Sequence, residues 1–596
     1  MFQTFVSQTS PENVAPRLAA LRDTLHTQKV DGFIIPRTDA HQGEYCAPCD
    51  ERLAWLTGFT GSAGFAVALR ENAAIFVDGR YTIQVQNQTD VTAFPPQNWP
   101  ATGLVDWLLE HAPEGAKIAY DPWLHSAGEI NAATKNLAAS GISLVPSRNL
   151  VDQIWQDRPT PPQEKAFIQP IELTGKNHDD KRRDIAGTLA EDALVLTLPD
   201  SINWLLNIRG RDIAHNPVCQ CFAILHKDAR IDLFVDPAKL DDALHTHLGA
   251  AVTCHPVDAF VPQLTTLSGQ VLLDQRSVPM AVYAALLGGD ATPVLSTDPC
   301  ILSKACKTPQ ELQGARDAHL VDAGAMVEFL AWLDQEAPKG DLTEIDIVTA
   351  LEGFRTKTGL LQEISFDTIS GAGPNGAIVH YRVTEDSNRD IDQDTFLLVD
   401  SGGQYTSGTT DITRTIAIGT VSDTQKRHFT RVLQGMIAIS RVAFPRGLSG
   451  RDLDALARYP LWLEGCDYDH GTGHGVGAYL SVHEGPQGIA RKYEVPFQEG
   501  MILSNEPGYY VADGYGIRLE NLISVTSAPE RGDGRDMLSF ETLTYVPIDK
   551  RAIDMSLLSA DEIAWLNAYH AACWDQQEAR VSGPARLWLK NATATI

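Results

Sequence analysis

The stretch Gly471-Thr472-Gly473-His474-Gly475-Val476-Gly477 decides the fold, because its histidine has carboxylates on both sides of it along the chain. Each carboxylate lies in a compact motif of its own: Asp400 in residues 397–403, Asp411 in residues 408–415, Glu506 in residues 504–508 and Glu520 in residues 516–521. Four carboxylates and one imidazole form an oxygen-rich ligand set that suits divalent ions such as Mn²⁺ and suits copper(I) or an iron–sulfur cluster badly. Four negative ligands balance two divalent ions, so the first hypothesis is a paired-metal site that activates water.

Local sequence around the two aspartates supports this hypothesis. Thr395-Phe396-Leu397-Leu398-Val399 is a short apolar run that predicts a buried strand ending at Asp400. A second strand is predicted from Ile412 to Ile418, opened by Asp411, with residues 402–408 as a hairpin connection. Such a hairpin would bring the two carboxylates side by side across neighbouring strands. Either aspartate alone would be interpreted as an ordinary turn residue, but three further Gly-flanked motifs favour a metal site.

The two neighbouring histidines exclude one familiar zinc motif. His470 and His474 are four residues apart, which on a helix would indicate a zinc-binding pair. Glycines at positions 471, 473, 475 and 477 disfavour a helix, and no glutamate follows His470. We therefore reject a zincin-type site and expect a glycine-rich loop, which lets the backbone approach a substrate closely.

A chain of 596 residues is too long for one core and is predicted to divide into three parts. Alternating helix and strand patterns predict an α/β domain over residues 1–155 and a second one over residues 156–306, separated by the Pro-rich stretch 158–162. The segment 55–59 precedes the segment 76–78 in the first domain much as the similar segment 204–208 precedes 234–236 in the second. These two matches are weak evidence that the second domain repeats the first. The third part, residues 307–596, opens with the capping box Thr308-Pro309-Gln310-Glu311 and ends in a helical tail from about residue 550.

Charge, hydropathy and cysteine content indicate which partners and which cellular location to expect. The net charge of −28 argues against nucleic acid or an anionic membrane as a partner. We find no signal-peptide pattern at the N-terminus and no apolar run of about 18 residues that could span a membrane. Nine cysteines, an odd number scattered through the chain, favour reduced thiols in the cytoplasm. Cys46 and Cys49 form a CxxC without a second such pair, and we interpret it as incidental.

The five carboxylate and histidine segments resemble, in the same chain order, the metal-ligand motifs of the pita-bread metallopeptidases, which include methionine aminopeptidase, prolidase and aminopeptidase P. Further segments narrow the resemblance to the long, three-domain aminopeptidase P (Xaa-Pro aminopeptidase) family. They are residues 366–369, residues 373–381, His470-Gly471-Thr472-Gly473-His474, and Val482-His483-Glu484-Gly485-Pro486. The resemblance runs from about residue 30 almost to the C-terminus and shows no departure at a ligand or catalytic-histidine position.

The resemblance implies an α/β (α+β) chain with two related creatinase-like domains, residues 1–155 and 156–306, before a pita-bread catalytic domain at 307–596. It implies a metal-dependent aminopeptidase that releases the N-terminal residue from peptides with proline at position two. Two divalent ions per chain are implied, with Mn²⁺ preferred and Co²⁺, Zn²⁺ or Fe²⁺ also suited to the ligands. A homodimer is implied as well, because in relatives the region beyond about residue 550 supports dimer contacts.

The resemblance also assigns roles to individual residues. The implied metal ligands are Asp400, Asp411, His474, Glu506 and Glu520, with Asp411 and Glu520 shared between two ions that activate water. Glu506 would also act as general base. The implied substrate contacts are His380, His483 and Arg80 (in Asp78-Gly79-Arg80-Tyr81), and His470 is a further active-site histidine. Taken alone, His380 would be interpreted as a structural histidine.

Related activities remain as alternatives. Prolidase, an Xaa-Pro dipeptidase, shares the site but usually has one N-terminal domain and a shorter chain. Methionine aminopeptidase is shorter still, and creatinase lacks the metal ligands. Some relatives are non-catalytic proteins that hold peptides or histones, and these have lost ligands that this chain retains. The prolidase-type activity is the first alternative, and a non-catalytic relative is the second.

Overall fold

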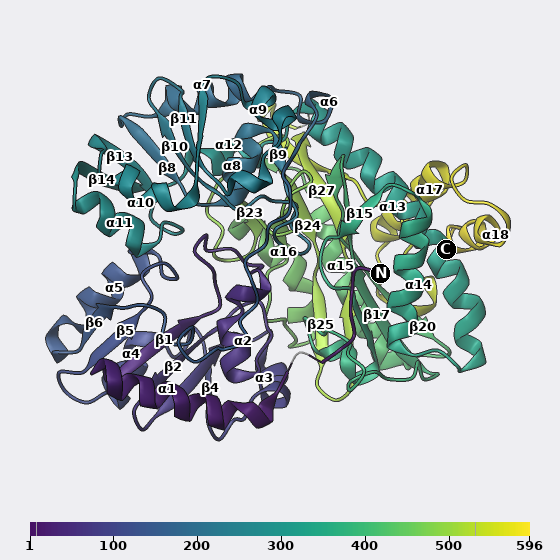
Figure 1. Cartoon of the computed structure of the whole chain (residues 1–596). Coiled ribbons are helices and arrows are strands. Elements are labelled where there is room, and N and C mark those ends of the chain that lie inside the picture. The colour runs from purple at the N-terminus through teal and green to yellow at the C-terminus, as the bar shows by residue number, and fades with distance from the viewer. Residues whose placement is uncertain (8, 531) are drawn as a thin grey trace. The chain divides into compact units, whose positions relative to one another are not determined.

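The computed structural model describes residues 1–7, 9–530 and 532–596 (Figure 1). These residues group into two compact units. The N-terminal unit consists of Gln8–Ile171 and Lys176–Ile301, and the C-terminal unit consists of Met1–Ser7, Glu172–Gly175 and Leu302–Ile596. Among the described residues, no helix has the length and apolar character that crossing a membrane requires.

The N-terminal unit contains two six-stranded sheets. The first has the order β4-β3-β2-β1-β5-β6, with β1 Gly32–Pro36, β2 Phe65–Leu69, β3 Ala73–Val77, β4 Pro96–Asn98, β5 Lys117–Tyr120 and β6 Ser143–Pro146. The second has the order β12-β11-β10-β8-β13-β14, with β8 Ala193–Leu196, β10 Phe222–His226, β11 Ile231–Phe234, β12 Val252–His255, β13 Ser268–Asp274 and β14 Asp290–Ser296.

The two sheets have the same topology. In each, the strand that comes first in the chain (β1 or β8) pairs antiparallel with the second, which pairs antiparallel with the third. The remaining three pairings are parallel in both sheets. Six strands in one order with one pattern of directions confirm the related N-terminal α/β domains that two short sequence matches only suggested.

Helices accompany both sheets. Around the first are α1 Val14–Gln28, α2 Arg52–Thr57, α3 Thr82–Gln88, α4 Leu104–His111 and α5 Ala127–Leu137. Around the second are α7 His178–Thr188, α8 Pro199–Leu206, α9 Asp242–Leu248, α10 Phe260–Leu264 and α11 Met280–Leu287. The helix α12, Pro299–Ala305, begins in the N-terminal unit and ends in the C-terminal unit.

The C-terminal unit is built on antiparallel strands. Two three-stranded sheets have the orders β16-β17-β20 and β15-β18-β19, with β15 Leu361–Ile364, β16 Ile369–Ala372, β17 Thr395–Ser401, β18 Gly403–Tyr405, β19 Gly408–Thr409 and β20 Ile412–Ile418. A six-stranded sheet has the order β21-β28-β27-β24-β22-β23, with β21 Phe444–Pro445, β22 Gly473–Gly475, β23 Glu484–Ile489, β24 Ile502–Asn505, β27 Asn521–Ser527 and β28 Met537–Thr542. A hairpin of β25 Gly508–Val511 and β26 Tyr515–Arg518 lies between β24 and β27 in the chain.

The described part of this unit also contains the helices α13 Pro309–Glu336, α14 Glu344–Lys357, α15 Asp423–Arg441, α16 Gly450–Trp462, α17 Ala560–Gln577 and α18 Gly583–Ala592. The predicted capping box is present at the start of α13, where Thr308 accepts from Glu311 N and the Glu311 side chain accepts from Thr308 N. The helical tail predicted beyond residue 550 is confirmed as α17 and α18, which pack against α13 (Figure 1).

The predicted strands around the aspartates are confirmed. β17 begins at Thr395, and β20 covers the predicted Ile412 to Ile418. Every residue of β20 is buried, because the strand is covered on both faces. The predicted connection between these strands is a small hairpin of its own, formed by β18 and β19.

The expectation of a glycine-rich loop around His474 is wrong, because residues 473–475 form strand β22 between β23 and β24. The glycines serve close strand packing there. A Cβ on Gly473 would lie 2.0 Å from the carbonyl oxygen of Ser504, and a Cβ on Gly475 would lie 2.5 Å from that of Glu484. Tertiary packing therefore overrides the low strand propensity of glycine.

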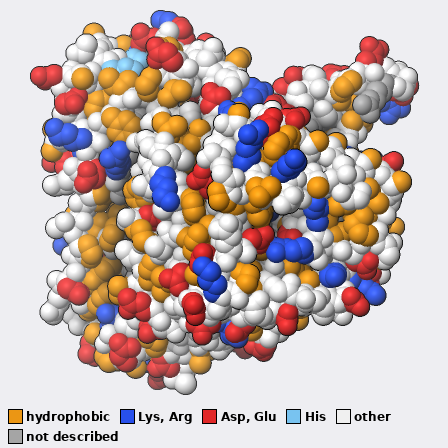
Figure 2. Space-filling model, turned by 90° about the vertical axis from the view of Figure 1, so that its right-hand side faces the viewer, with side chains coloured by type: hydrophobic (Ala, Val, Ile, Leu, Met, Phe, Trp, Pro, Cys, Tyr) orange, Lys and Arg blue, Asp and Glu red, His pale blue; other side chains and the backbone are white. Residues whose placement is uncertain are grey.

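Charged side chains are dispersed over the face seen in Figure 2. Lys and Arg side chains occur singly among acidic and apolar ones and do not gather into a basic patch there.

Candidate active site

The two predicted aspartate ligands lie at the paired ends of two antiparallel strands. Asp400 is the penultimate residue of β17, and Asp411 immediately precedes β20. The register pairs Asp400 with Thr413. Because side chains alternate along a strand, Asp411 and Thr413 share a face, and Asp411 is the diagonal neighbour of Asp400 on that face. The two carboxylates are therefore on one face, offset by one step of the ladder.

The other three predicted ligands come from the six-stranded sheet. His474 is the central residue of β22, and Glu506 and Glu520 extend β24 and β27 at the end where Asn505 pairs with Asn521. Glu506 N donates to Thr472 O (2.8 Å), and Glu520 N donates to Thr413 O (3.1 Å). The second bond joins this end of the six-stranded sheet to β20, the strand that follows Asp411.

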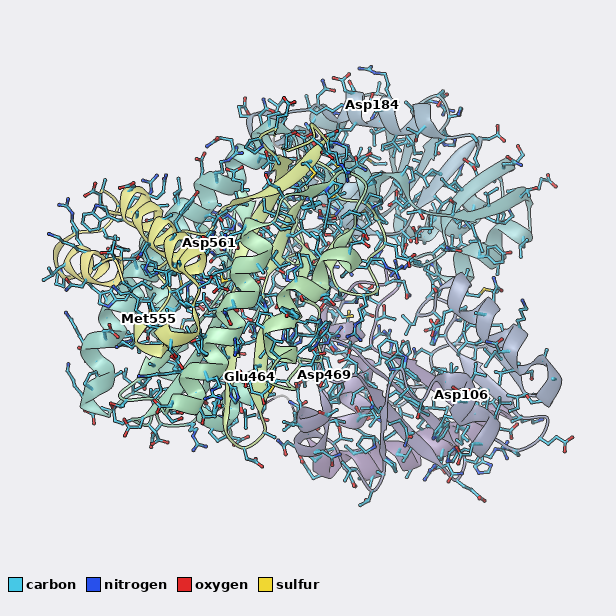
Figure 3. The ribbon with its side chains drawn as sticks, turned by 180° about the vertical axis from the view of Figure 1, so that it is seen from behind. Asp106, Asp184, Glu464, Asp469, Met555 and Asp561 are labelled. Carbon is cyan, nitrogen blue, oxygen red and sulfur yellow. The ribbon has the colours of Figure 1, made fainter. Side chains whose placement is uncertain are left out.

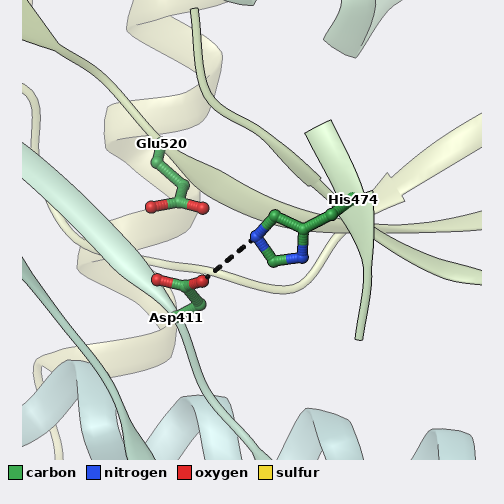
Figure 4. Close-up of side chains that lie close together, drawn as sticks. All are labelled: Asp411, His474 and Glu520. Carbon is green, nitrogen blue, oxygen red and sulfur yellow. Dashed lines mark ion pairs between the residues drawn. The ribbon is translucent and has the colours of Figure 1, made fainter. Parts of the chain in front are cut away.

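Three of these side chains form a compact cluster (Figure 4). One ligand atom from each of Asp411, His474 and Glu520 lies within 4.8 Å of the other two. His474 Nε2 lies 3.5 Å from Asp411 Oδ2 and 3.5 Å from Glu506 Oε1. Both distances exceed those of charge-assisted hydrogen bonds, which are about 2.7–2.9 Å. They suit donors arranged around an ion about 2.0–2.2 Å from each of them.

A hydrogen bond sets the tautomer of His474. Its Nδ1 lies 2.9 Å from the carbonyl oxygen of Gly475, which can only accept, so Nδ1 carries the proton. The lone pair of Nε2 then faces the carboxylates. A backbone carbonyl that orients the far nitrogen in this way is typical of histidines that bind metals.

Electrostatics in the cluster call for positive charge. Burial raises the pKa of Asp411 and of Glu520 well above the ordinary range, and repulsion from the neighbouring carboxylates raises both further. Among the described residues, no hydrogen bond reaches the buried oxygens Asp400 Oδ1, Asp411 Oδ1 and Glu520 Oε1. Buried carboxylate oxygens without partners are costly. The donor set and its orphaned oxygens fit divalent cations.

Neighbouring side chains hold one oxygen of each of three predicted ligands. Thr413 Oγ1 donates to Glu520 Oε2 (2.8 Å), Ser504 Oγ donates to Glu506 Oε1 (3.1 Å), and Arg518 Nη2 donates to Asp400 Oδ2 (2.6 Å). Sequence reasoning missed these three residues, although each lies within three positions of a predicted ligand. Arg518 could have been found from the sequence, because it is a cationic residue two positions before the predicted ligand Glu520.

His470 joins the site indirectly. Arg518 Nη1 donates to Tyr510 Oη (2.7 Å), so the Tyr510 hydroxyl can donate to His470 Nε2 at 2.8 Å. His470 Nδ1 lies 2.8 Å from the Gly471 carbonyl, which fixes its tautomer in the same way as that of His474. His470 thus connects to Asp400 through Tyr510 and Arg518, and burial raises the pKa of Tyr510 to about 12.

The remaining predicted residues lie in different surroundings. The His483 ring meets the His474 ring edge-on, with centroids 4.3 Å apart. His380 lies in the turn after the short 3₁₀ helix Gly373–Ala377. Arg80 belongs to the N-terminal unit, where its guanidinium donates to Asp78 (2.7 Å) and lies over the Tyr81 ring, 5.2 Å from the centroid.

A buried glutamate organises the loop that carries His380. Glu344, at the first turn of α14, is fully buried. Its carboxylate accepts hydrogen bonds from both ends of the loop and from within it: Ala372 N (2.7 Å), Asn375 Nδ2 (3.0 Å), Tyr381 Oη (2.8 Å) and Arg389 N (3.2 Å). Burial raises the pKa of Glu344 to about 7 in spite of these bonds.

Family models cover almost the whole chain. Metallopeptidase family M24 matches residues 313–527, and the C-terminal region of that peptidase matches residues 536–596. The creatinase/prolidase N-terminal domain matches twice, at residues 17–154 and 157–311.

Relatives agree with these matches. A probable Xaa-Pro aminopeptidase P of Aspergillus fumigatus is 39% identical, over 100% of this chain and 95% of that protein. The solved X-prolyl aminopeptidase of Caenorhabditis elegans, a cytosolic enzyme with a di-nuclear active site, matches with a TM-score of 0.94 and 34% identity, over 98% of this chain and 100% of that one. An Xaa-Pro dipeptidase of Bacillus anthracis matches with a TM-score of 0.51 and 25% identity, over 62% of this chain and 98% of that one.

The fold, the clustered carboxylates and these matches define a metallopeptidase. The chain belongs to family M24, among its three-domain aminopeptidase P members. The predicted architecture of two creatinase-like domains followed by a pita-bread catalytic domain is confirmed.

Glu344 gives the stability a pH dependence. A carboxyl group whose pKa is raised on folding contributes stability below its unfolded value of 4.5, and this contribution is lost as pH rises through the folded value of about 7. We expect the melting temperature of the wild type to fall relative to that of Glu344→Gln between pH 5 and pH 8. The difference corresponds to about 1.4 kcal/mol for each pKa unit. Parallel melting curves of the two proteins across this range would contradict the raised pKa.

Proposed function

We propose that this chain is a metal-dependent aminopeptidase that releases the N-terminal residue from peptides whose second residue is proline. One observation carries the proposal: the chain retains all five ligand-type side chains, and three of them, Asp411, His474 and Glu520, form a cluster in which buried carboxylate oxygens have no partner among the described residues. Full-length similarity to proteins named Xaa-Pro aminopeptidase supports the substrate class.

The alternatives fit less well. The Xaa-Pro dipeptidase match covers nearly all of that protein and only 62% of this chain, so this chain has a domain more than a prolidase needs. A non-catalytic role would tolerate loss of ligands, whereas Asp400, Asp411, His474, Glu506 and Glu520 are all present.

We propose that these five side chains would hold two divalent ions, with Asp411 and Glu520 as the ligands that both ions would share. The two shared ligands are the carboxyl groups with raised pKa values, and two cations would relieve the repulsion that raises them. We propose Mn²⁺ as the native metal, because four carboxylates and one imidazole suit a borderline, oxygen-preferring ion. Co²⁺, Zn²⁺ and Fe²⁺ suit the same donors.

In the proposed reaction each of these side chains has a separate role. Divalent ions held here would polarise the scissile carbonyl and lower the pKa of a water molecule toward neutrality. Glu506 acts as general base, since Ser504 holds its Oε1 and leaves Oε2 to take the proton. His380 and His483 donate hydrogen bonds to the developing oxyanion, while His470 holds the Tyr510 hydroxyl through Nε2. Arg80 is the further substrate contact that the resemblance implies.

Proline at the second position shapes the substrate site. Its tertiary amide has no N–H and its ring fixes φ, so the site needs room for a rigid ring and no acceptor at that nitrogen. We place the His380 and His483 side chains along this ring. The acidic cluster attracts the free α-amine of the substrate, which limits cleavage to one residue.

Substrate choice tests the function. With Mn²⁺ added after chelation, the protein should hydrolyse an Xaa-Pro-Xaa tripeptide and leave both an Xaa-Pro dipeptide and a Met-Ala peptide intact. Product analysis by mass spectrometry reports each reaction. Turnover of the dipeptide alone would indicate a prolidase, and turnover of none would indicate a binding protein.

Metal content tests the assigned ligands. Asp411→Ala and Glu520→Ala should bring metal occupancy and activity toward zero together, because each removes a ligand shared by two ions. His483→Ala should keep both ions and lower kcat by about 10²-fold, as expected for a lost proton-transfer or oxyanion contact. Metal analysis beside kcat separates these effects. If His483→Ala lost the metal and His474→Ala kept it, the assignment of the two histidines would be wrong.

We also propose a homodimer that forms through α16. Four large apolar side chains lie exposed within eight residues at the C-terminal end of this helix: Leu456, Tyr459, Trp462 and Leu463. Leu456, Tyr459 and Leu463 follow helical spacing and share a face. Glu464, labelled in Figure 3, follows directly after this apolar face and would lie at its polar rim.

Substitution of this face should separate the subunits. Tyr459→Glu combined with Leu463→Glu is expected to give a monomer in sedimentation velocity, because two charges would lie in the apolar contact. Leu587→Glu tests the alternative interface: this leucine is equally exposed but lies on α18, in the tail for which the resemblance implies dimer contacts. A monomer from Leu587→Glu, with α16 variants still dimeric, would move the interface to the tail.

We further propose a cytoplasmic location. All nine cysteines are free thiols, which is typical of a reducing compartment. The related Caenorhabditis elegans enzyme is cytosolic, which supports the same location here.

A further inference from the structure

A buried glutamate lies between two buried lysines beside the active site. Glu484 is the first residue of β23. Lys304 Nζ pairs with its Oε2 and Lys307 Nζ with its Oε1, and all three side chains are at most 7% exposed. Lys307 Nζ also donates to the carbonyl oxygen of Lys304 (3.1 Å), which ties the two lysines together.

Stability does not explain this cluster. Burial lowers the pKa of the Lys307 ammonium group, and Glu484 opposes that shift. Burying three charges costs desolvation energy, and apolar residues of the same size often stabilise a protein as well or better. What the cluster provides is geometry, because both carboxylate oxygens of Glu484 are held from two directions.

Glu484 is placed where its fixed side chain can orient an active-site histidine. It directly follows His483, whose ring lies edge-on against His474. The ladder between β22 and β23 is interrupted here: Gly475 pairs with Glu484, but His474 pairs with Gly488, so residues 485–487 have no partner on β22. Strand pairing with Gly475 thus holds the backbone of Glu484 at the edge of this register shift, and the ion-paired side chain of Glu484 adds a second anchor directly after His483.

We propose that Lys304 and Lys307 are positioning residues for the reaction, which fix His483 through Glu484. The proposal rests on the function proposed above and on the role of His483 in it. Both lysines lie where the chain enters the C-terminal unit, Lys304 on α12 and Lys307 next to the N-cap of α13. The first residues of this stretch of the C-terminal unit would therefore also support a substrate histidine.

The test is a double-mutant cycle. Lys307→Met leaves Lys304 and Glu484 as a one-to-one pair, so we expect a folded protein with both metal ions bound. Its kcat should fall about tenfold or more, as expected when a reacting group is displaced by a fraction of an ångström. In the His483→Ala background the same substitution should cause no further loss, because the two residues then act through one contact. Lys304→Met should behave in the same way.

A matched control separates positioning from general destabilisation. Lys239 is a buried lysine paired with Asp212 at 2.7 Å in the N-terminal unit, and Lys239→Met should lower the melting temperature and leave kcat within about twofold. If Lys307→Met does not fold, Glu484→Gln runs the same cycle.

Two outcomes would overturn the proposal. One is an equal loss of kcat in both backgrounds, and the other is an unchanged kcat in a folded variant that holds two metal ions. Failure of the underlying function shows separately, as a wild type without Xaa-Pro hydrolysis or as a His483→Ala protein with full kcat.

Discussion

Repulsion among buried carboxylates is the constraint on which the site depends. Asp400, Asp411 and Glu520 are all at most 8% exposed, and Glu506 lies 3.5 Å from His474 Nε2 beside them. A folded chain holds such groups together only if other interactions offset the cost of desolvation and of like charge. The framework meets part of this cost with one fixed cation, the Arg518 guanidinium on Asp400. Divalent cations bound at the proposed site would offset the rest.

Backbone bonds hold the strands against this repulsion. Arg414, between Thr413 and Thr415 on β20, points to the side of the strand away from the proposed metal ligands and is 1% exposed. Its guanidinium donates to the carbonyl oxygens of Thr413 (2.9 Å), Glu520 (2.6 Å) and Val546 (2.7 Å), and to the hydroxyl oxygen of Tyr569 (2.9 Å) on α17. One side chain thus joins the strand after Asp411, the turn at Glu520 and the C-terminal helix. The tail is therefore a structural support of the ligand geometry.

Those strands, helix starts and ligand motifs that depend on local sequence pattern could be predicted from the sequence. β17, β20 and the start of α13 follow from apolar runs and a capping box, and the five ligand-type residues follow from short motifs. The partners of those ligands did not follow, since Arg518 and Asp400 are 118 positions apart and Glu484 and Lys304 are 180 apart. The strand at His474 was mistaken for a loop, because its glycines reflect the close approach of Ser504 and Glu484, which only the folded chain reveals.

The same electrostatic problem has two solutions in this unit. Glu484 is a buried carboxylate whose two counter-charges, Lys304 and Lys307, are covalently part of the chain and cannot leave. Asp411 and Glu520 have no lysine or arginine within ion-pair distance among the described residues, and each keeps one oxygen without a hydrogen bond. Lysines that are part of the chain fix the position of the Glu484 carboxylate. Carboxylate oxygens without a partner can instead bind a metal ion, and a metal ion can also polarise a substrate. Glu484 with its two lysines lies one residue from His483, and the carboxylates of Asp411 and Glu520 lie beside His474. The rigid ion-paired cluster and the proposed metal site are therefore neighbours in the fold.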